Sequence, residues 1–155
     1  MTLYFAYGSN MHRAVMREHA PGAVPVGIAA LADHRFIITA DGYASVEPMR
    51  RHVVYGVLWR IAAGDRVKLD AWENVARGLY RAARLPVSQA GGRRLALVYI
   101  ARPRREGAAR RGYIELVIAA ARDWHLPPAY IASLQRWAPP RPAGAGHKLG
   151  EFGWT

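Results

Sequence analysis

The sequence contains no cysteine, which excludes disulfide bonds, thiol nucleophiles and metal sites with cysteine ligands. It also lacks any hydrophobic run near the roughly 18 residues that suggest a membrane-spanning helix. No basic, apolar, small-residue leader precedes the first strand-like residues. We therefore expect a soluble cytoplasmic protein that does not act at a membrane.

Motifs of several common enzyme classes are missing too. The sequence has no GxSxG nucleophile elbow, no phosphate-binding GxxxxGK[ST] loop and no GxGxxG dinucleotide motif. The six histidines never occur four residues apart, so no pair has the spacing of a helical metal site. Ser9 is available as a nucleophile, but no base is evident for it, and we interpret it as a capping residue. The residues themselves therefore nominate no metal, no cofactor and no covalent nucleophile.

Acidic residues and lysine are scarce. The chain has 22 basic residues against 11 acidic ones, a net charge of +11, and only Lys68 and Lys148 are lysine. The arginines are dispersed except in an arginine-rich loop, residues 102–111, which we interpret as solvated. Nucleic-acid binding through this loop is the alternative, but no aromatic residues for base stacking are interleaved with it. We therefore do not expect a nucleic-acid partner.

The residues that are present are typical of a folded globular domain. The 155 residues are 52% hydrophobic and 21% charged, which is enough to bury a substantial core in one domain. We predict a single domain over residues 1–155. Its last part, residues 139–155, is rich in proline and glycine and is expected to be a loosely held tail.

The opening stretch YFAYGSN, residues 4–10, predicts a short strand that runs into a glycine turn. Gly8 permits a sharp turn and the close approach of a ligand, while Ser9 and Asn10 are good N-cap residues for a short helix over 12–19. Such a junction leaves backbone N–H groups beside the positive end of a helix dipole, which suits an anion or an oxyanion. A plain strand-to-helix turn is the alternative, and these residues alone do not decide between the two.

The rest of the chain predicts mostly strands followed by helices. Residues 53–61 carry apolar side chains on both faces, which indicates a central strand or a barrel wall. Asp41 and Gly42 predict a turn, and Pro48 is expected to end a short strand. The expected strands cover 24–32, 35–39, 44–47, 53–61, 80–87 and 93–101, and the expected helices cover 66–72 with Asp65 as N-cap, 113–124, and a segment from 126–128 to Trp137. We predict an α+β fold whose mixed, mostly antiparallel sheet curls into a small β-barrel flanked by helices.

Glu73 stands out among the acidic residues. Its neighbours include Leu69, Trp72 and Val75, and apolar surroundings raise the pKa of a glutamate above its reference of about 4.3. A general base works best when its pKa lies near the operating pH, so Glu73 is a candidate general base. The alternative is an ordinary exposed glutamate at the end of a short helix.

Three sequence blocks together resemble the γ-glutamyl cyclotransferase family. They are YFAYGSNM at the start, YGVLWRI in the strand predicted to be central, and LDAWENV followed by Tyr80. Residues 41–46, 112–114 and 126–130 also resemble the family's corresponding segments. The blocks occur in the family's order, and the resemblance covers most of residues 3–137.

The resemblance implies a small β-barrel flanked by helices, and it assigns roles to particular residues. Glu73 matches the family's catalytic glutamate and would be the general acid/base. The opening loop would bind the substrate through its backbone amides, and Tyr113, which opens the helix after the last strand, would contact the substrate. One departure is Asn74, where many relatives have glycine. The substrate-binding residues implied are Tyr4, Phe5, Ala6, Tyr7, Gly8, Ser9, Asn10 and Tyr113.

The implied reaction needs neither a metal nor a cofactor, because the nucleophile belongs to the substrate. The α-amine of a small γ-glutamyl compound attacks its own γ-carbonyl and releases 5-oxoproline with an amino acid or amine, as in glutathione-related metabolism. One alternative is the same reaction on a γ-glutamyl amine or a biosynthetic intermediate. Another is a non-catalytic module that binds a small ligand or nucleic acid. The oligomeric state is not predicted.

Overall fold

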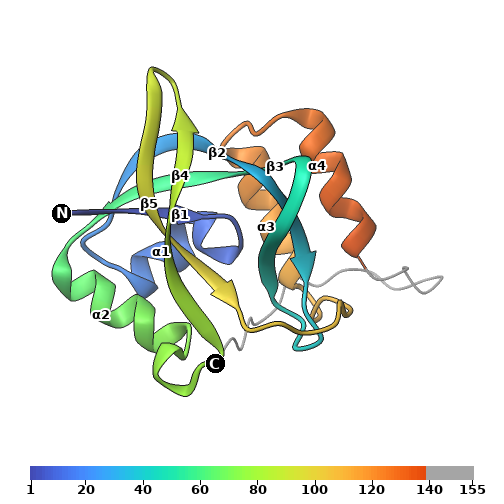
Figure 1. The fold of residues 1–155 in the computed structure, drawn as a ribbon, viewed down its shortest axis with the longest axis horizontal. Helices are drawn as coiled ribbons and strands as arrows, with labels where there is room; N and C mark the ends of the chain where they lie inside the picture. Colours follow the sequence, from blue (N-terminus) through green and yellow to red (C-terminus); the bar gives the residue numbers. More distant parts are fainter. Residues whose placement is uncertain (139–155) are drawn as a thin grey trace.

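The computed structural model describes residues 1–138, and five strands of this part close into a barrel in the order β1-β3-β2-β4-β5 (Figure 1). β5 and β1 pair in parallel, with Tyr4 opposite Leu97, and the other neighbours are antiparallel. The strands are β1 (Thr2–Ala6), β2 (Val24–Ile38), β3 (Ala44–Ile61), β4 (Tyr80–Gln89) and β5 (Gly92–Ala101). The predicted mixed, mostly antiparallel barrel is confirmed.

Helices flank the barrel, as predicted. Figure 1 shows α3 and α4 together on one side of the barrel, while α2 lies with α1 at the other side. The helices are α1 (Arg13–His19), α2 (Ala63–Trp72), α3 (Tyr113–Asp123) and α4 (Pro128–Leu134), with single 3-10 turns η1 (Ser9–Met11), η2 (Val75–Arg77) and η3 (Gln135–Trp137). Among the helices of residues 1–138, none combines the length and the apolar character that crossing a membrane requires.

The breaks predicted in β2 and β3 are wrong, because the two strands form one long hairpin. A bulge stands where β2 was expected to stop: Asp33 and Arg51 have φ angles of 56° and 66°, and the Asp33 carboxylate accepts a hydrogen bond from the Arg51 N–H at 3.1 Å. Pro48 pairs with His34 inside the hairpin. Proline has no N–H to donate to a neighbouring strand. β1 pairs only with residues 57–61 of β3, so it needs no hydrogen bond from Pro48.

The second half of β3 is the central strand that the alternation predicted. Its residues 57–60 pair with β1 on one side and with β2 on the other. Val54, Val57 and Leu58 are fully buried in the core. Gly56 is required where β1 crosses, since a Cβ there would lie 2.3 Å from the Ala6 carbonyl oxygen.

α2 begins earlier than predicted, at Ala63, and its N-cap is Ala62 instead of Asp65. The Asp65 side chain is buried and accepts hydrogen bonds from the N–H groups of Ala62 at 3.1 Å and Gly22 at 3.0 Å. Asp65 therefore ties the first turn of α2 to the turn after α1. This fixes the direction of α2, and Glu73 follows at its other end.

The junction after β1 differs from the prediction in its caps. Ser9 and Asn10 do not cap α1, whose N-cap is His12 without a side-chain hydrogen bond. They belong to η1, in which the N–H of Met11 bonds to the Gly8 carbonyl at 3.1 Å. The tail predicted over 139–155 lies outside the described residues, and a single domain over the whole chain stays a prediction.

Candidate active site

A cavity of about 430 Å³ opens where the end of β1, the β2–β3 turn, the end of α2 and the start of α3 meet. Its volume lies within the range of small-molecule sites. Tyrosines, a few carboxylates and several arginines dominate its wall. The lining residues are Tyr4, Tyr7, Gly8, Ser9, Asn10, His19, Asp41, Tyr43, Ala44, Trp72, Glu73, Asn74, Leu79, Tyr80, Tyr99, Arg102, Arg104, Arg110 and Tyr113.

Glu73 stands at the C-terminal end of α2, where its N–H bonds to the Leu69 carbonyl at 2.9 Å. The chain turns away at Asn74, which has the left-handed angles φ 51° and ψ 44° that asparagine tolerates. Burial raises the pKa of the Glu73 carboxyl to about 7, and the negative end of a helix dipole acts in the same direction. In residues 1–138 no hydrogen bond or ion pair engages its carboxylate. Glu73 is therefore a free carboxylate poised near neutral pH.

Four tyrosines surround this carboxylate. Burial raises the pKa values of Tyr4, Tyr7, Tyr80 and Tyr113, and the negative charge of Glu73 is a further cause for each of them. The pKa of Tyr113 rises to about 12, although hydrogen bonds from Ala44 and Ser9 oppose the rise. All four phenols therefore carry their protons at neutral pH, and the cavity presents hydroxyl groups beside an acid/base group.

Backbone hydrogen bonds fix three of these phenols. The Tyr7 hydroxyl donates to the carbonyl of Tyr99 in β5. The Tyr80 hydroxyl donates to the Ala44 carbonyl at 2.7 Å, while the Tyr113 hydroxyl accepts from the Ala44 N–H at 3.3 Å. The start of β3 thus ties β4 to α3 across the cavity, and hydrogen bonds hold these side chains of the wall in place.

A second polar chain supports the wall near η1. The Asn10 amide donates to the Tyr4 hydroxyl at 3.0 Å, and its oxygen lies 2.7 Å from Nδ1 of His19. Because that oxygen can only accept, Nδ1 of His19 carries the hydrogen. The His19 ring stacks on Trp72 at 3.9 Å, and burial lowers its pKa. His19 is thus a neutral part of the wall at pH 7.

The predicted site residues come together with two exceptions. Tyr4, Tyr7, Gly8, Ser9, Asn10, Glu73 and Tyr113 all line the cavity. Phe5 and Ala6 do not; they are buried in the core, with 0% and 1% of their surfaces exposed. Alternation along β1 directs Tyr4 one way and Phe5 the other. The N–H groups of Ser9 and Asn10 precede the first internal hydrogen bond of η1, so the turn itself cannot satisfy them.

Further residues line the cavity that were not predicted from the sequence, among them two tyrosines and three arginines. Tyr80 and Tyr99 come from the paired strands β4 and β5. Tyr99 lies in an apolar run of the sequence, which gave no sign that its hydroxyl group faces a cavity. Arg102, Arg104 and Arg110 belong to the arginine-rich loop. The interpretation of that loop as merely solvated is therefore incomplete, because part of it faces the cavity. No group of three or more His, Asp or Glu that could hold a metal occurs among residues 1–138.

Proteins of known name resemble this chain in sequence or in fold. Gamma-glutamylcyclotransferase of Mus musculus is 26% identical over 148 residues, which are 88% of this chain and 79% of that protein. The Bos taurus protein of the same name is 29% identical over 103 residues; that match covers 60% of this chain and only 55% of the bovine protein. A solved gamma-glutamyl cyclotransferase superposes with a TM-score of 0.84 at 23% identity, covering 95% of this chain and 94% of its own.

The match to the family spans the central strand, Glu73 and the start of α3. The AIG2-like family matches residues 53–134, more than half of the 155 residues. The named relatives confirm the resemblance to γ-glutamyl cyclotransferases that the motifs indicated. The chain therefore belongs to the AIG2-like family.

Proposed function

We propose that this protein is a γ-glutamyl cyclotransferase, an enzyme that converts a small γ-glutamyl compound into 5-oxoproline and a free amino acid or amine. The observation that carries the proposal is Glu73. Its carboxylate has a pKa raised to about 7 by burial and lines a cavity of tyrosine hydroxyls. A carboxyl group of this kind suits proton transfer near neutral pH.

In the proposed reaction the α-nitrogen of the glutamyl group attacks the γ-carbonyl carbon of the same group. A carbon–nitrogen bond forms, closes the five-membered ring, and the bond from that carbon to the leaving nitrogen breaks. The attacking nitrogen starts as an ammonium group and loses two protons, whereas the leaving nitrogen gains two as it departs as an ammonium group. Glu73 carries these protons from one nitrogen to the other, one at a time.

The other lining groups bind and orient in this proposal. The backbone amides of Gly8 and Asn10 hold the oxygen on which negative charge develops, or the substrate carboxylate, while the Ser9 backbone bonds to the Tyr113 hydroxyl beside them. One well-aimed donor to an oxyanion is worth roughly 3–4 kcal/mol. Tyr113 contacts the glutamyl chain and keeps it folded. Orientation of an intramolecular attack recovers roughly 7–11 kcal/mol, whereas a 10²–10⁴-fold gain from proton transfer corresponds to roughly 3–5 kcal/mol. Positioning therefore outweighs proton transfer in this proposal.

This reaction calls on no metal and no cofactor, because the attacking nitrogen is part of the substrate. The glutamyl half is common to γ-glutamyl amino acids, γ-glutamyl amines and γ-glutamylated biosynthetic intermediates, so the groups around Glu73 suit all three. A pocket that only bound a ligand would not need a carboxyl group whose pKa suits proton transfer near neutral pH.

The Glu73→Gln variant tests the proposal. It keeps the size of the side chain but cannot move a proton, so 5-oxoproline release from γ-glutamyl dipeptides and amines should fall by 10²–10⁴-fold. Asp123→Asn is the matched control, because it neutralises an exposed carboxylate away from the cavity and should leave release unchanged. Activity of Glu73→Gln within about tenfold of the wild type would show that Glu73 is not the general base.

A further inference from the structure

The arginine-rich loop, residues 102–111, gives the cavity positive charge that the proposed reaction does not use. Arg102, Arg104 and Arg110 line the cavity. The carboxylates that line it in the described part of the chain are Glu73 and Asp41. Asp41 pairs with Arg104 at 2.9 Å, which neutralises one of the three guanidinium groups.

The other two guanidinium groups have no carboxylate partner in residues 1–138. Arg110 donates from Nε to the backbone carbonyl of Asp41 at 2.9 Å, and its guanidinium lies 4.7 Å from the centre of the Tyr43 ring. These contacts orient the group and leave its terminal nitrogens available. Arg102 is held through its backbone, whose N–H bonds to the Leu79 carbonyl at 3.0 Å.

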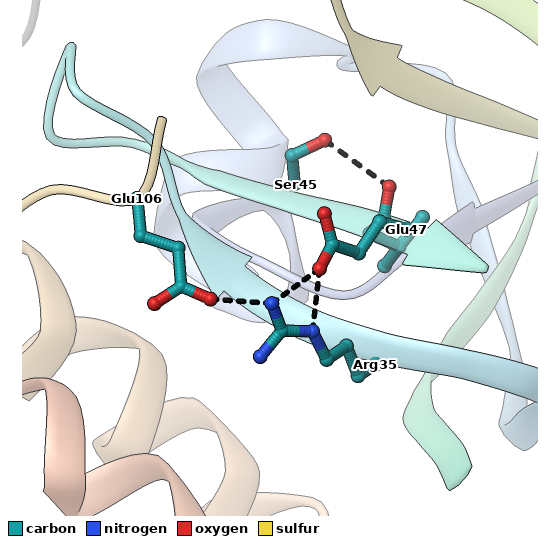
Figure 2. Close-up of polar contacts among 5 residues, drawn as sticks. Arg35, Ser45, Glu47 and Glu106 are labelled. Carbon is teal, nitrogen blue, oxygen red and sulfur yellow. Dashed lines mark hydrogen bonds and ion pairs between the residues drawn. The ribbon is translucent and has the colours of Figure 1, made fainter. Parts of the chain in front are cut away.

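The backbone that carries these arginines is fixed to the β2–β3 turn, beside which the loop runs in Figure 1. Three hydrogen bonds join them: Ala40 N–H to the Arg105 carbonyl at 2.8 Å, Gly107 N–H to the Ile38 carbonyl at 2.9 Å, and Arg110 N–H to the Gly42 carbonyl at 3.1 Å. Figure 2 shows a further clamp, in which Arg35 contacts both Glu47 of β3 and Glu106 of the loop. The arginines are therefore presented from an ordered segment, which lowers the entropy cost of binding an anion.

The charges of a γ-glutamyl substrate can be assigned group by group. The glutamyl half carries an ammonium and a carboxylate. The proposed function gives the ammonium to Glu73, and of the two roles it offers the amides after β1 we take the binding of the carboxylate. The reacting carbonyl carries no charge, so any group left for Arg102 and Arg110 belongs to the leaving amine. Each guanidinium binds one carboxylate, and a cationic leaving amine would be repelled.

We infer that the leaving amine of the substrate carries two carboxylates, as an acidic amino acid does, and that Arg102 and Arg110 bind them. This inference rests on the proposed function and adds a specificity site to it. Both side chains are largely exposed, so water and salt weaken the attraction. We expect each carboxylate to improve kcat/KM by about tenfold, mainly through KM.

Two matched pairs of substrates isolate the charge. γ-Glutamyl-glutamate and γ-glutamyl-glutamine have the same shape and differ in the side-chain carboxylate of the leaving amine. γ-Glutamyl-alanine and γ-glutamylethylamide differ in its α-carboxylate. Release of 5-oxoproline from each compound is measured at low salt and at 1 M salt. We expect about a tenfold higher kcat/KM for the more acidic member of each pair, and a smaller ratio at 1 M salt, where screening is strong.

Arginine variants assign the effect to residues. Because each guanidinium binds one carboxylate, one of the variants Arg102→Gln and Arg110→Gln should bring the glutamate-to-glutamine ratio toward one, and the other should do so for the alanine-to-ethylamide ratio. Arg111→Gln removes the same charge from the neighbouring position, which does not line the cavity, and should keep both ratios. Equal use of both members of each pair, or an Arg111→Gln variant that narrows either ratio as much as Arg102→Gln or Arg110→Gln does, would overturn the inference alone. A folded protein that releases 5-oxoproline from none of the four compounds would overturn the proposed function, and this inference with it.

Discussion

The hydroxyl oxygen of Tyr113 lies 2.8 Å from the point that a Cβ atom on Gly8 would occupy. Tyr113 opens α3 and Gly8 follows β1, so this contact joins two ends of the fold at the cavity wall. The hydroxyl cannot swing aside without cost, because it is buried and accepts a hydrogen bond from the Ala44 N–H at 3.3 Å. Gly8 is therefore required for the close approach of Tyr113, whatever the backbone angles at residue 8 permit.

We predict that Gly8→Ala destabilises the protein by about 1–3 kcal/mol, the usual cost of overpacking a buried contact, and lowers 5-oxoproline release. Tyr113→Phe removes the oxygen that the new methyl group would meet. In the double variant the loss should therefore be smaller than the sum of the two single losses. Denaturant unfolding of the four proteins measures this coupling free energy; additive losses would mean that the two residues do not contact each other.

Glu73 links activity to stability. Its pKa rises from 4.5 to about 7 on folding because of burial, so the folded state holds a proton that the unfolded chain has released. Below pH 4.5 this raised pKa does not lower the free energy of unfolding. Between pH 4.5 and 7 it lowers that free energy increasingly, and above pH 7 the loss is complete. We predict that Glu73→Gln raises the free energy of unfolding at pH 8.5, by an amount on the order of 3 kcal/mol.

The pH dependence of the difference in unfolding free energy between Glu73→Gln and the wild type tests this prediction more stringently than a single pH does. The stability advantage of Glu73→Gln should shrink as the pH falls through 7 and vanish near 4.5. The exposed Asp123→Asn variant serves as the control for a lost carboxylate. A Glu73→Gln advantage that stays constant from pH 5 to 8.5 would show that the glutamate carboxyl does not titrate in this range.

Asn74 replaces the glycine that the resemblance led us to expect, and its φ of 51° is left-handed. We predict that Asn74→Gly changes stability and activity little, since glycine adopts these angles freely. Asn74→Val should lose about 1–2 kcal/mol, because a β-branched residue resists the left-handed region. The altered turn then changes the orientation of Glu73. Release of 5-oxoproline should therefore fall even under conditions in which the variant is fully folded. Full activity in Asn74→Val would mean that this turn does not orient Glu73.

The barrel could be predicted from sequence because its determinants are local, whereas the roles of Glu73 and Tyr113 came from the resemblance and stay predictions. Alternation in residues 53–61 and the position of Tyr113 at a helix start depend on neighbours in the chain. The β2–β3 hairpin could not be predicted, because its bulge depends on a hydrogen bond between Asp33 and Arg51, 18 positions apart. The role of the arginine-rich loop was missed for a similar reason: Arg35, which clamps it through Glu106, lies 71 positions away.

The Arg35 clamp leads to a prediction about the loop itself. Arg35 is partly buried and contacts the carboxylates of Glu47 and Glu106 together (Figure 2). Arg35→Met keeps an apolar stem of similar length but removes the charge, which leaves two carboxylates near each other. We predict that the loop then opens more often. Exchange of the Gly107 N–H, which bonds to the Ile38 carbonyl at 2.9 Å, should quicken about tenfold, which corresponds to ~1.4 kcal/mol.

Amide exchange separates this local effect from a loss of the whole fold. Amides of α3, such as that of Val117 in the buried core, report on global unfolding and should keep their rates if the clamp acts only on the loop. Glu106→Gln removes the other end of the contact and should quicken the same Gly107 amide, while Arg105→Met, a neighbouring exposed arginine, should not. If amide exchange quickens equally at Gly107 and Val117, Arg35 stabilises the whole barrel and not the loop in particular. In that case the loop would owe its order to its backbone hydrogen bonds alone.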